Sequence, residues 1–159
     1  MKAAADASIL IFFAKLEKLG LLLRLYPGLC ISKTVFDEIM AGNDRWQNEC
    51  EEIRKLINGK KIILAAAKGK ENLSGEKSTI MLAKSKKIGI VLMDDYAGSR
   101  EAKLHGLKVY SCPYLILRAL KHKYIAKKEF DRLLEGLLEY NYFISPKLLK
   151  KIIEISDKI

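Results

Sequence analysis

Apolar positions along the chain fall into short runs, which are separated by longer stretches with helical spacing of apolar and polar residues. Short apolar runs bounded by polar or turn-forming residues are typical of strands that are buried in a sheet. The pattern therefore predicts about five strands. They are Ala3–Ala5, Leu29–Ser32, Ile62–Ala65, Ile90–Met93 and Lys108–Ser111.

The stretches between these runs carry the start and stop signals of α-helices. Ser8, Thr34 and Ser74 are expected to accept hydrogen bonds from first-turn backbone N–H groups, and glycine or proline follows several of the expected ends. The predicted helices are Ser8–Leu25, Thr34–Ala41, Asp44–Ile57, Ser74–Lys87, a segment after Asp95, a segment from Pro113, Lys127–Tyr142 and Pro146–Lys158.

Strands that alternate with helices indicate an α/β protein. Helical connections place neighbouring strands parallel and cover both faces of the sheet. We therefore expect a three-layer α/β/α fold with a central, mainly parallel sheet of about five strands. At 159 residues the chain is long enough for a substantial core, and we expect residues 1–159 to form a single domain.

Composition excludes several classes of protein. The apolar region 9–25 contains four charged residues, which argues against a membrane span or a signal peptide and favours a cytoplasmic protein with no membrane partner. Three cysteines without a Cys-x-x-Cys pair fit a reduced protein that lacks a zinc knuckle. Two histidines are too few for most histidine-based metal sites, so any metal site should use carboxylates.

The net charge of +10 indicates either a polyanionic partner or a surface rich in lysine for solubility. Basic residues are spread along the chain and do not form a terminal tail. Charge alone leaves both interpretations open.

Five acidic residues lie where strands end or helices begin. Asp6 follows the first predicted strand, and Asp94 and Asp95 follow the fourth. Glu38 and Glu76 lie near the starts of two predicted helices. Ligands of open α/β sheets bind at the carboxyl edge of the strands, and hard divalent cations prefer oxygen ligands. These acids are therefore candidates for one metal site.

Each acid also has a structural interpretation. Glu76 lies on the apolar stripe of its helix, which favours a site over a simple helix-start charge. Asp37 lies three residues after Thr34, as a capping-box acid would, so we assign capping to Asp37 and the site to Glu38. One of Asp94 and Asp95 is expected to cap the following helix, while a cation would relieve their mutual repulsion.

Two polar residues are weaker candidates for contacts with nucleic acid. Ser8 is expected mainly as a helix N-cap, although it can also lie at the site. Arg100 can contact a phosphate or simply extend from a helix into solvent.

Four segments, in order, resemble the motifs of PIN-domain proteins. The third resembles the Gly-Glu-x-x-x-Ile-x-Leu-Ala motif of one subgroup, and the tail from Tyr110 to Ile159 fits the same subgroup. The chain departs from that subgroup at Ser99, where an arginine is expected directly after Gly98. The segments are Ala5-Asp6-Ala7-Ser8-Ile9-Leu10-Ile11, Ile31-Ser32-Lys33-Thr34-Val35-Phe36-Asp37-Glu38-Ile39, Ser74-Gly75-Glu76 with Ile80 and Leu82-Ala83, and Val91-Leu92-Met93-Asp94-Asp95 with Gly98, Arg100, Ala102 and Gly106-Leu107-Lys108-Val109.

The resemblance implies a metal-dependent ribonuclease that hydrolyses single-stranded RNA. It implies that Asp6, Glu38, Glu76 and Asp95 are catalytic and bind Mg²⁺ or Mn²⁺, with Asp94 as a neighbouring candidate ligand. Many relatives are toxins of toxin–antitoxin pairs, so an antitoxin protein is an expected class of partner. Relatives often form homodimers, and the same is expected here.

Alternative functions and an interaction surface also follow from the sequence. The chain can be a catalytically idle PIN-fold module that binds nucleic acid or an antitoxin, or a receiver-like or phosphatase-like α/β domain, which also has acids at strand ends. Residues expected to extend the apolar surface for a dimer are Tyr26, Leu29, Trp46 and the stretch Tyr110–Leu117.

Overall fold

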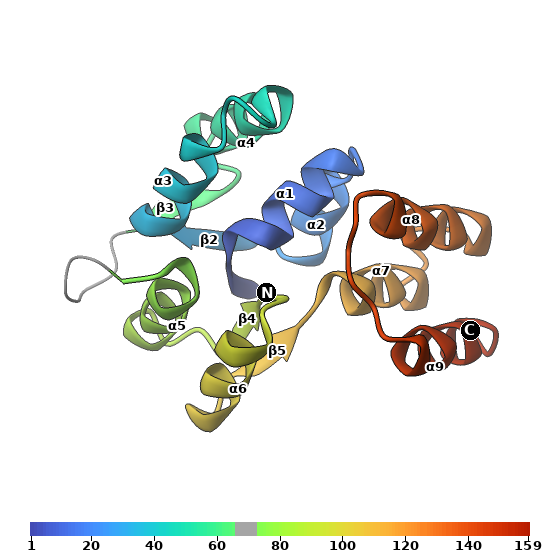
Figure 1. The fold of residues 1–159 in the computed structure, drawn as a ribbon. Coiled ribbons are helices and arrows are strands. Elements are labelled where there is room, and N and C mark those ends of the chain that lie inside the picture. Colours follow the sequence, from blue (N-terminus) through green and yellow to red (C-terminus); the bar gives the residue numbers. More distant parts are fainter. Residues whose placement is uncertain (66–72) are drawn as a thin grey trace.

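The computed structural model describes residues 1–65 and 73–159, and its centre is a parallel five-stranded sheet in the order β3-β2-β1-β4-β5 (Figure 1). The strands confirm the sequence predictions to within one residue at each end. They are β1 (Lys2–Ala5), β2 (Gly28–Ser32), β3 (Ile63–Ala65), β4 (Ile90–Leu92) and β5 (Lys108–Tyr110).

Nine helices surround the sheet among the described residues. They confirm the predicted three-layer α/β/α architecture (Figure 1). The helices are α1 (Ala7–Lys15), α2 (Leu19–Leu25), α3 (Lys33–Ala41), α4 (Gln47–Asn58), α5 (Gly75–Ser85), α6 (Tyr96–Leu104), α7 (Cys112–Lys121), α8 (Lys127–Glu139) and α9 (Pro146–Ser156).

The alanines of β1 show how the sheet separates two apolar cores. Side chains of a strand alternate between the two faces. Ala3 and Ala5 accordingly belong to the larger core with α1, α2, α7 and α8, whereas Ala4 belongs to a smaller core with α5 and α6. All three alanines are fully buried. Their small side chains let helices pack closely on both faces of the central strand.

Strand β1 lies between β2 and β4, and this arrangement positions the candidate acids. Ala4 is paired with Cys30 of β2 and with Val91 of β4. The backbone N–H of Asp6 then donates to the carbonyl of Leu92 at 3.1 Å. The segments that follow β1 and β4 are therefore side by side at the same edge of the sheet.

The predicted helix Ser8–Leu25 was wrong, because two helices occupy this segment. Glu17 has a left-handed backbone with φ of 56°, and the backbone N–H of Lys18 donates to the carbonyl of Phe13 at 2.7 Å. This geometry ends α1 before α2 begins at Leu19. Glycine usually occupies this left-handed position. Because the chain has a glutamate there, the sequence pattern did not predict the end of the helix.

Two predicted N-caps were also wrong. Asp6, and not Ser8, caps α1, because its carboxylate accepts from the backbone N–H of Ser8. Ser32, and not Thr34, caps α3 and accepts from the backbone N–H of Val35 at 3.1 Å. Each helix therefore begins earlier than predicted, directly after the strand. Ser74 caps α5 as predicted.

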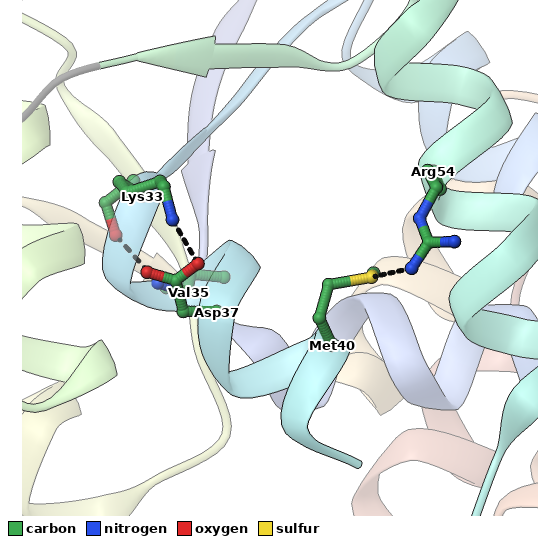
Figure 2. Close-up of polar contacts among 6 residues, drawn as sticks. Lys33, Val35, Asp37, Met40 and Arg54 are labelled. Atoms are coloured by element: carbon green, nitrogen blue, oxygen red, sulfur yellow. Dashed lines mark hydrogen bonds and ion pairs between the residues drawn. The ribbon is translucent and has the colours of Figure 1, made fainter. Parts of the chain in front are cut away.

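Asp37 does not have the capping role predicted for it. It forms an exposed ion pair with Lys33, one helical turn earlier on α3 (Figure 2). An exposed pair of this kind contributes little to stability.

Figure 2 also shows the contact between α4 and α3, where an Arg54 Nη lies 3.1 Å from the Met40 sulfur.

The apolar surface predicted around Tyr26 and Leu29 was wrong as well. Both residues are fully buried in the larger core, and Trp46 is half-buried against that core. Of the stretch Tyr110–Leu117, Tyr114 is the most exposed residue, at 40%. None of the helices within the described ranges 1–65 and 73–159 has both the length and the apolar character to cross a membrane.

Candidate metal centre

The five candidate acids line one pocket of about 530 Å³ at the carboxyl edge of the sheet. They come from four separate segments of the chain. Asp6 follows β1, Asp94 and Asp95 follow β4, Glu38 lies on α3 and Glu76 lies in the first turn of α5. These acids share one pocket, as a common site requires, but among the described residues no three of them are already placed to hold one ion. We refer to it as the carboxylate pocket.

Asp6 is the most deeply buried of these acids, with 6% of its surface exposed. Its Oδ1 accepts from the backbone N–H of Ser8 at 2.7 Å and from the Ser8 hydroxyl at 3.2 Å. Burial raises the pKa of Asp6 to about 7, and the nearby carboxylates of Glu76 and Asp94 add to the increase. Asp6 is thus held in place by α1, and no positively charged side chain among the described residues offsets its charge.

Glu38 is held by the start of α5. Its Oε1 accepts from the backbone N–H of Gly75 at 2.9 Å. A Cβ atom at position 75 would lie 2.9 Å from the Cδ of Glu38 and even closer to Oε2, so only glycine allows this approach. Partial burial raises the pKa of Glu38, and the charge of Glu76 adds to the increase.

Asp95 is the member of the acidic doublet that caps the next helix. Its Oδ2 accepts from the backbone N–H of Gly98 at 2.6 Å, at the start of α6. The expectation that one acid of the doublet has this role is confirmed. The carboxylate remains at the pocket wall, as does that of Asp6, so capping does not remove either acid from the site.

Asp94 points into the protein. Its Oδ1 accepts from the backbone N–H of Cys112 at 2.9 Å and from the Tyr142 hydroxyl at 2.6 Å. Its Oδ2 is buried and has no hydrogen-bond partner among the described residues. Burial raises the pKa of Asp94. The carboxylate of Asp94 is therefore held by hydrogen bonds inside the protein, and it does not cap the next helix.

Glu76 is half-buried in the first turn of α5 and lies close to Gly98 in the first turn of α6. A Cβ atom at position 98 would lie 2.9 Å from the Cβ of Glu76 and 2.7 Å from the Met93 sulfur. Gly98 therefore lets α6 approach α5 and brings Glu76 beside the acidic doublet.

Ser8 and Arg100 have different positions relative to the pocket. Ser8 lines it, but its hydroxyl is bonded to Asp6. Arg100 is an exposed residue of α6 and does not belong to the described lining of the pocket. The solvent-facing interpretation of Arg100 agrees with this position.

The loop after α8 forms a wall of the pocket that the sequence pattern did not predict. Asn141, Tyr142 and Phe143 line it together with Ile11 and Phe12 of α1. The Phe12 and Tyr142 rings meet edge to face, with centroids 5.2 Å apart. The sequence signal for this loop is an asparagine followed by two aromatic residues, because asparagine often ends a helix in the left-handed conformation. Asn141 does adopt that conformation, with φ of 60°.

The charge of the pocket fits a divalent cation. Three carboxyl groups have raised pKa values, as expected for metal-free ligands, and one buried carboxylate oxygen has no partner in the described part of the chain. Yet among the described residues no three His, Cys, Asp or Glu side chains are already arranged to hold one metal ion. The donor chemistry fits Mg²⁺ or Mn²⁺, and binding would require the carboxylates to move closer together.

The comparison with protein families gives one match. A family model described as a PIN domain matches residues 2–158, whereas a search of curated proteins gave no match. The strand order also differs from the 2-1-3-4-5 order of receiver domains, which argues against the receiver-like alternative. The fold is nuclease-like, and the match spans nearly the whole chain. The chain therefore belongs to the PIN-domain family.

Proposed function

We propose that the protein is a metal-dependent ribonuclease that hydrolyses phosphodiester bonds of single-stranded RNA. The observation that carries the proposal is the gathering of five carboxylates from four segments in one pocket at the carboxyl edge of a parallel sheet. A nuclease-like fold supports hydrolysis as the general reaction. The net charge of +10 favours a polyanionic substrate.

Hydrogen bonds within the protein position four of the carboxylates, which offer oxygen atoms to a cation. Asp6 and Asp95 are held by the helix starts that they cap, and Glu38 is held by the Gly75 backbone. Asp94 is anchored through one oxygen, whereas its buried second oxygen has no hydrogen-bond partner among the described residues. Mg²⁺ or Mn²⁺ bound there would polarise a phosphate oxygen and lower the pKa of the attacking water.

The family resemblance extends the proposal to biological context. The Gly75-Glu76 segment resembles a subgroup similar to toxin-type PIN ribonucleases. We propose on this basis that the protein is the toxin of a toxin–antitoxin pair, works in the cytoplasm as a homodimer and is bound by an antitoxin protein. Nucleic-acid contacts by Ser8 and Arg100 remain part of the proposal, with Ser8 at the pocket and Arg100 outside it.

A cleavage assay tests the proposed reaction. Labelled single-stranded RNA is incubated with the protein in Mg²⁺ or Mn²⁺ and in EDTA. We expect cleavage only with the divalent ion, and we expect Asp6→Asn and Asp95→Asn to abolish it, because each substitution removes a ligand charge but preserves a capping oxygen. Asp37→Asn is the matched control, since Asp37 is an exposed acid paired with Lys33 outside the pocket.

One observation favours the alternative of an idle binding module. No ready-made set of three metal-binding side chains exists among the described residues. An idle module predicts that RNA stays intact with either ion although the protein binds it. Cleavage that persists in EDTA, or that is unchanged in both pocket variants, contradicts the proposed metal-dependent mechanism.

A further inference from the structure

A second groove of about 630 Å³ begins at the carboxylate pocket and has a different chemical character. Asp94 lines both cavities. Residues of α6, β5, α7 and α9 line the groove, and Figure 1 shows where these elements lie in the fold. We call it the tyrosine groove, and the lining residues that matter here are Tyr96, Lys103, Tyr110, Tyr114, Leu148 and Lys151.

Aromatic side chains give the groove exposed ring surfaces. Tyr96 directly follows Asp95 in the chain and is 82% exposed. Tyr110 and Tyr114 are stacked, with centroids 4.6 Å apart and an interplanar angle of 17°, and Tyr114 is 40% exposed. An exposed ring beside a carboxylate pocket offers a flat apolar face on which a nucleic-acid base can stack.

The charge of the groove is opposite to that of the neighbouring pocket. Lys103 and Lys151 line it, and Asp94, at the shared end, is the one acidic residue of its described lining. The Arg118 guanidinium, which is not part of the lining, lies 5.8 Å from the centre of the Tyr110 ring and adds positive charge nearby. The groove therefore attracts an anion with flat, apolar parts.

We propose that the tyrosine groove binds the segment of single-stranded RNA next to the bond that is cleaved, with a base stacked on Tyr96 and phosphates near Lys103 and Lys151. This inference rests on the proposed ribonuclease function. Single-stranded nucleic acids bind by stacking bases on aromatic rings and pairing phosphates with cations. Because Tyr96 follows Asp95 directly, a base on Tyr96 belongs to a nucleotide adjacent to the phosphate in the carboxylate pocket.

The chain contains two closely matched controls. Leu104 is on the same helix as Tyr96 and is 81% exposed, but it does not line the groove. Lys150 is adjacent to Lys151 on α9, but it is paired with Glu154 at 4.0 Å and also lies outside the groove. Alanine substitutions at Tyr96 and Leu104 are compared with each other, and so are those at Lys151 and Lys150. A difference within a pair reports the groove contact, whereas an equal effect reports only the loss of apolar surface or charge.

Fluorescence anisotropy with a short labelled single-stranded RNA in EDTA tests the proposal. We expect Tyr96→Ala to weaken binding about fivefold or more, while Tyr96→Phe retains it, because stacking needs the ring and not the hydroxyl. We expect Lys151→Ala to weaken binding and reduce its salt dependence by about one phosphate contact. Leu104→Ala and Lys150→Ala should bind as the wild type does.

The outcomes separate this inference from the proposed function. If the wild type cleaves RNA with Mn²⁺ but the Tyr96→Ala and Lys151→Ala variants bind RNA like their controls, the groove proposal is overturned and the ribonuclease proposal stands. If the wild type neither binds nor cleaves RNA, both are overturned. If light scattering shows a dimer that Leu148→Asp dissociates without changing RNA affinity, the groove is an interface between two copies, which also overturns the proposal.

Discussion

The Tyr142 hydroxyl donates a 2.6 Å hydrogen bond to Oδ1 of Asp94, across 48 residues of sequence. It connects the loop between α8 and α9 to the end of β4, inside the carboxylate pocket. Burial and the negative charge of Asp94 raise the pKa of Tyr142, so the phenol stays protonated and remains a donor. The C-terminal helices are thereby joined directly to the site.

Removal of this donor should destabilise the protein. We expect Tyr142→Phe to lower the free energy of unfolding by about 1.5–3 kcal/mol, the usual range for a hydrogen bond to a charged group. Urea denaturation measures the change. Tyr140→Phe is a control two residues away, at a ring that is 42% exposed. Equal stability of the two variants would show that the Tyr142–Asp94 bond contributes nothing to the folded state.

Gly75 should be required for the position of Glu38. In Gly75→Ala the new methyl group would collide with the Glu38 carboxylate and push it from its hydrogen bond to the backbone of residue 75. Loss of a group that orients a metal ligand typically lowers metal affinity or activity about 10–100-fold, and we expect a decrease of that size in RNA cleavage.

Gly20→Ala provides the control for this substitution. No heavy atom of the described surroundings lies within 4 Å of a Cβ at position 20, which is inside α2. Alanine there should leave cleavage unchanged and stabilise the helix by about 0.5–1 kcal/mol. Cleavage by Gly75→Ala at the wild-type rate, with circular dichroism showing a folded protein, would remove Glu38 from the proposed site.

The raised pKa of Asp6 predicts how metal-free stability depends on pH. Its pKa is about 7 in the folded protein, compared with 3.8 for an unperturbed group. Between these values the folded state binds more protons than the unfolded state, so the free energy of unfolding falls as pH rises. Above about pH 7 the loss is complete, and at 1.36 kcal/mol per pKa unit it amounts to about 4 kcal/mol as an upper limit.

Asp6→Asn should remove this pH dependence. The amide keeps an oxygen to cap α1 but carries no charge. We therefore expect the variant in EDTA to exceed the wild type in stability by more at about pH 8 than at about pH 5. Urea denaturation at both pH values checks this. A constant difference across pH, or a match to the exposed control Asp37→Asn, contradicts the assignment of a raised pKa to Asp6.

Divalent ions should stabilise the wild type more than they stabilise the Asp6→Asn or Asp95→Asn variant. Ions that bind only the folded state stabilise it by mass action, and they compete with protons for carboxylates. We expect Mn²⁺ to raise the Tm of the wild type, more at high pH than at low pH, and to raise that of Asp6→Asn or Asp95→Asn less. Thermal melts with Mn²⁺ and with EDTA measure this. An identical Mn²⁺ shift in the wild type and both variants would place the ion outside the carboxylate pocket.

The sequence by itself determined the strands, the α/β layering and the positions of the candidate acids. These features follow from local patterns, because a buried strand needs a short apolar run and helix starts favour acidic or hydroxyl side chains. Since parallel strands end at the same edge, acids after Ala5 and Met93 had to lie near each other once the sheet formed.

Only the tertiary structure decided how individual side chains are used. Glu17 ends α1 in a left-handed backbone conformation that a glutamate does not predict. The different roles of Asp94 and Asp95 depend on where Cys112 and Tyr142 lie. The tyrosine groove likewise combines residues of α6, β5, α7 and α9. Such contacts join distant segments, and local periodicity carries no information about them, because packing of the whole chain brings those segments together.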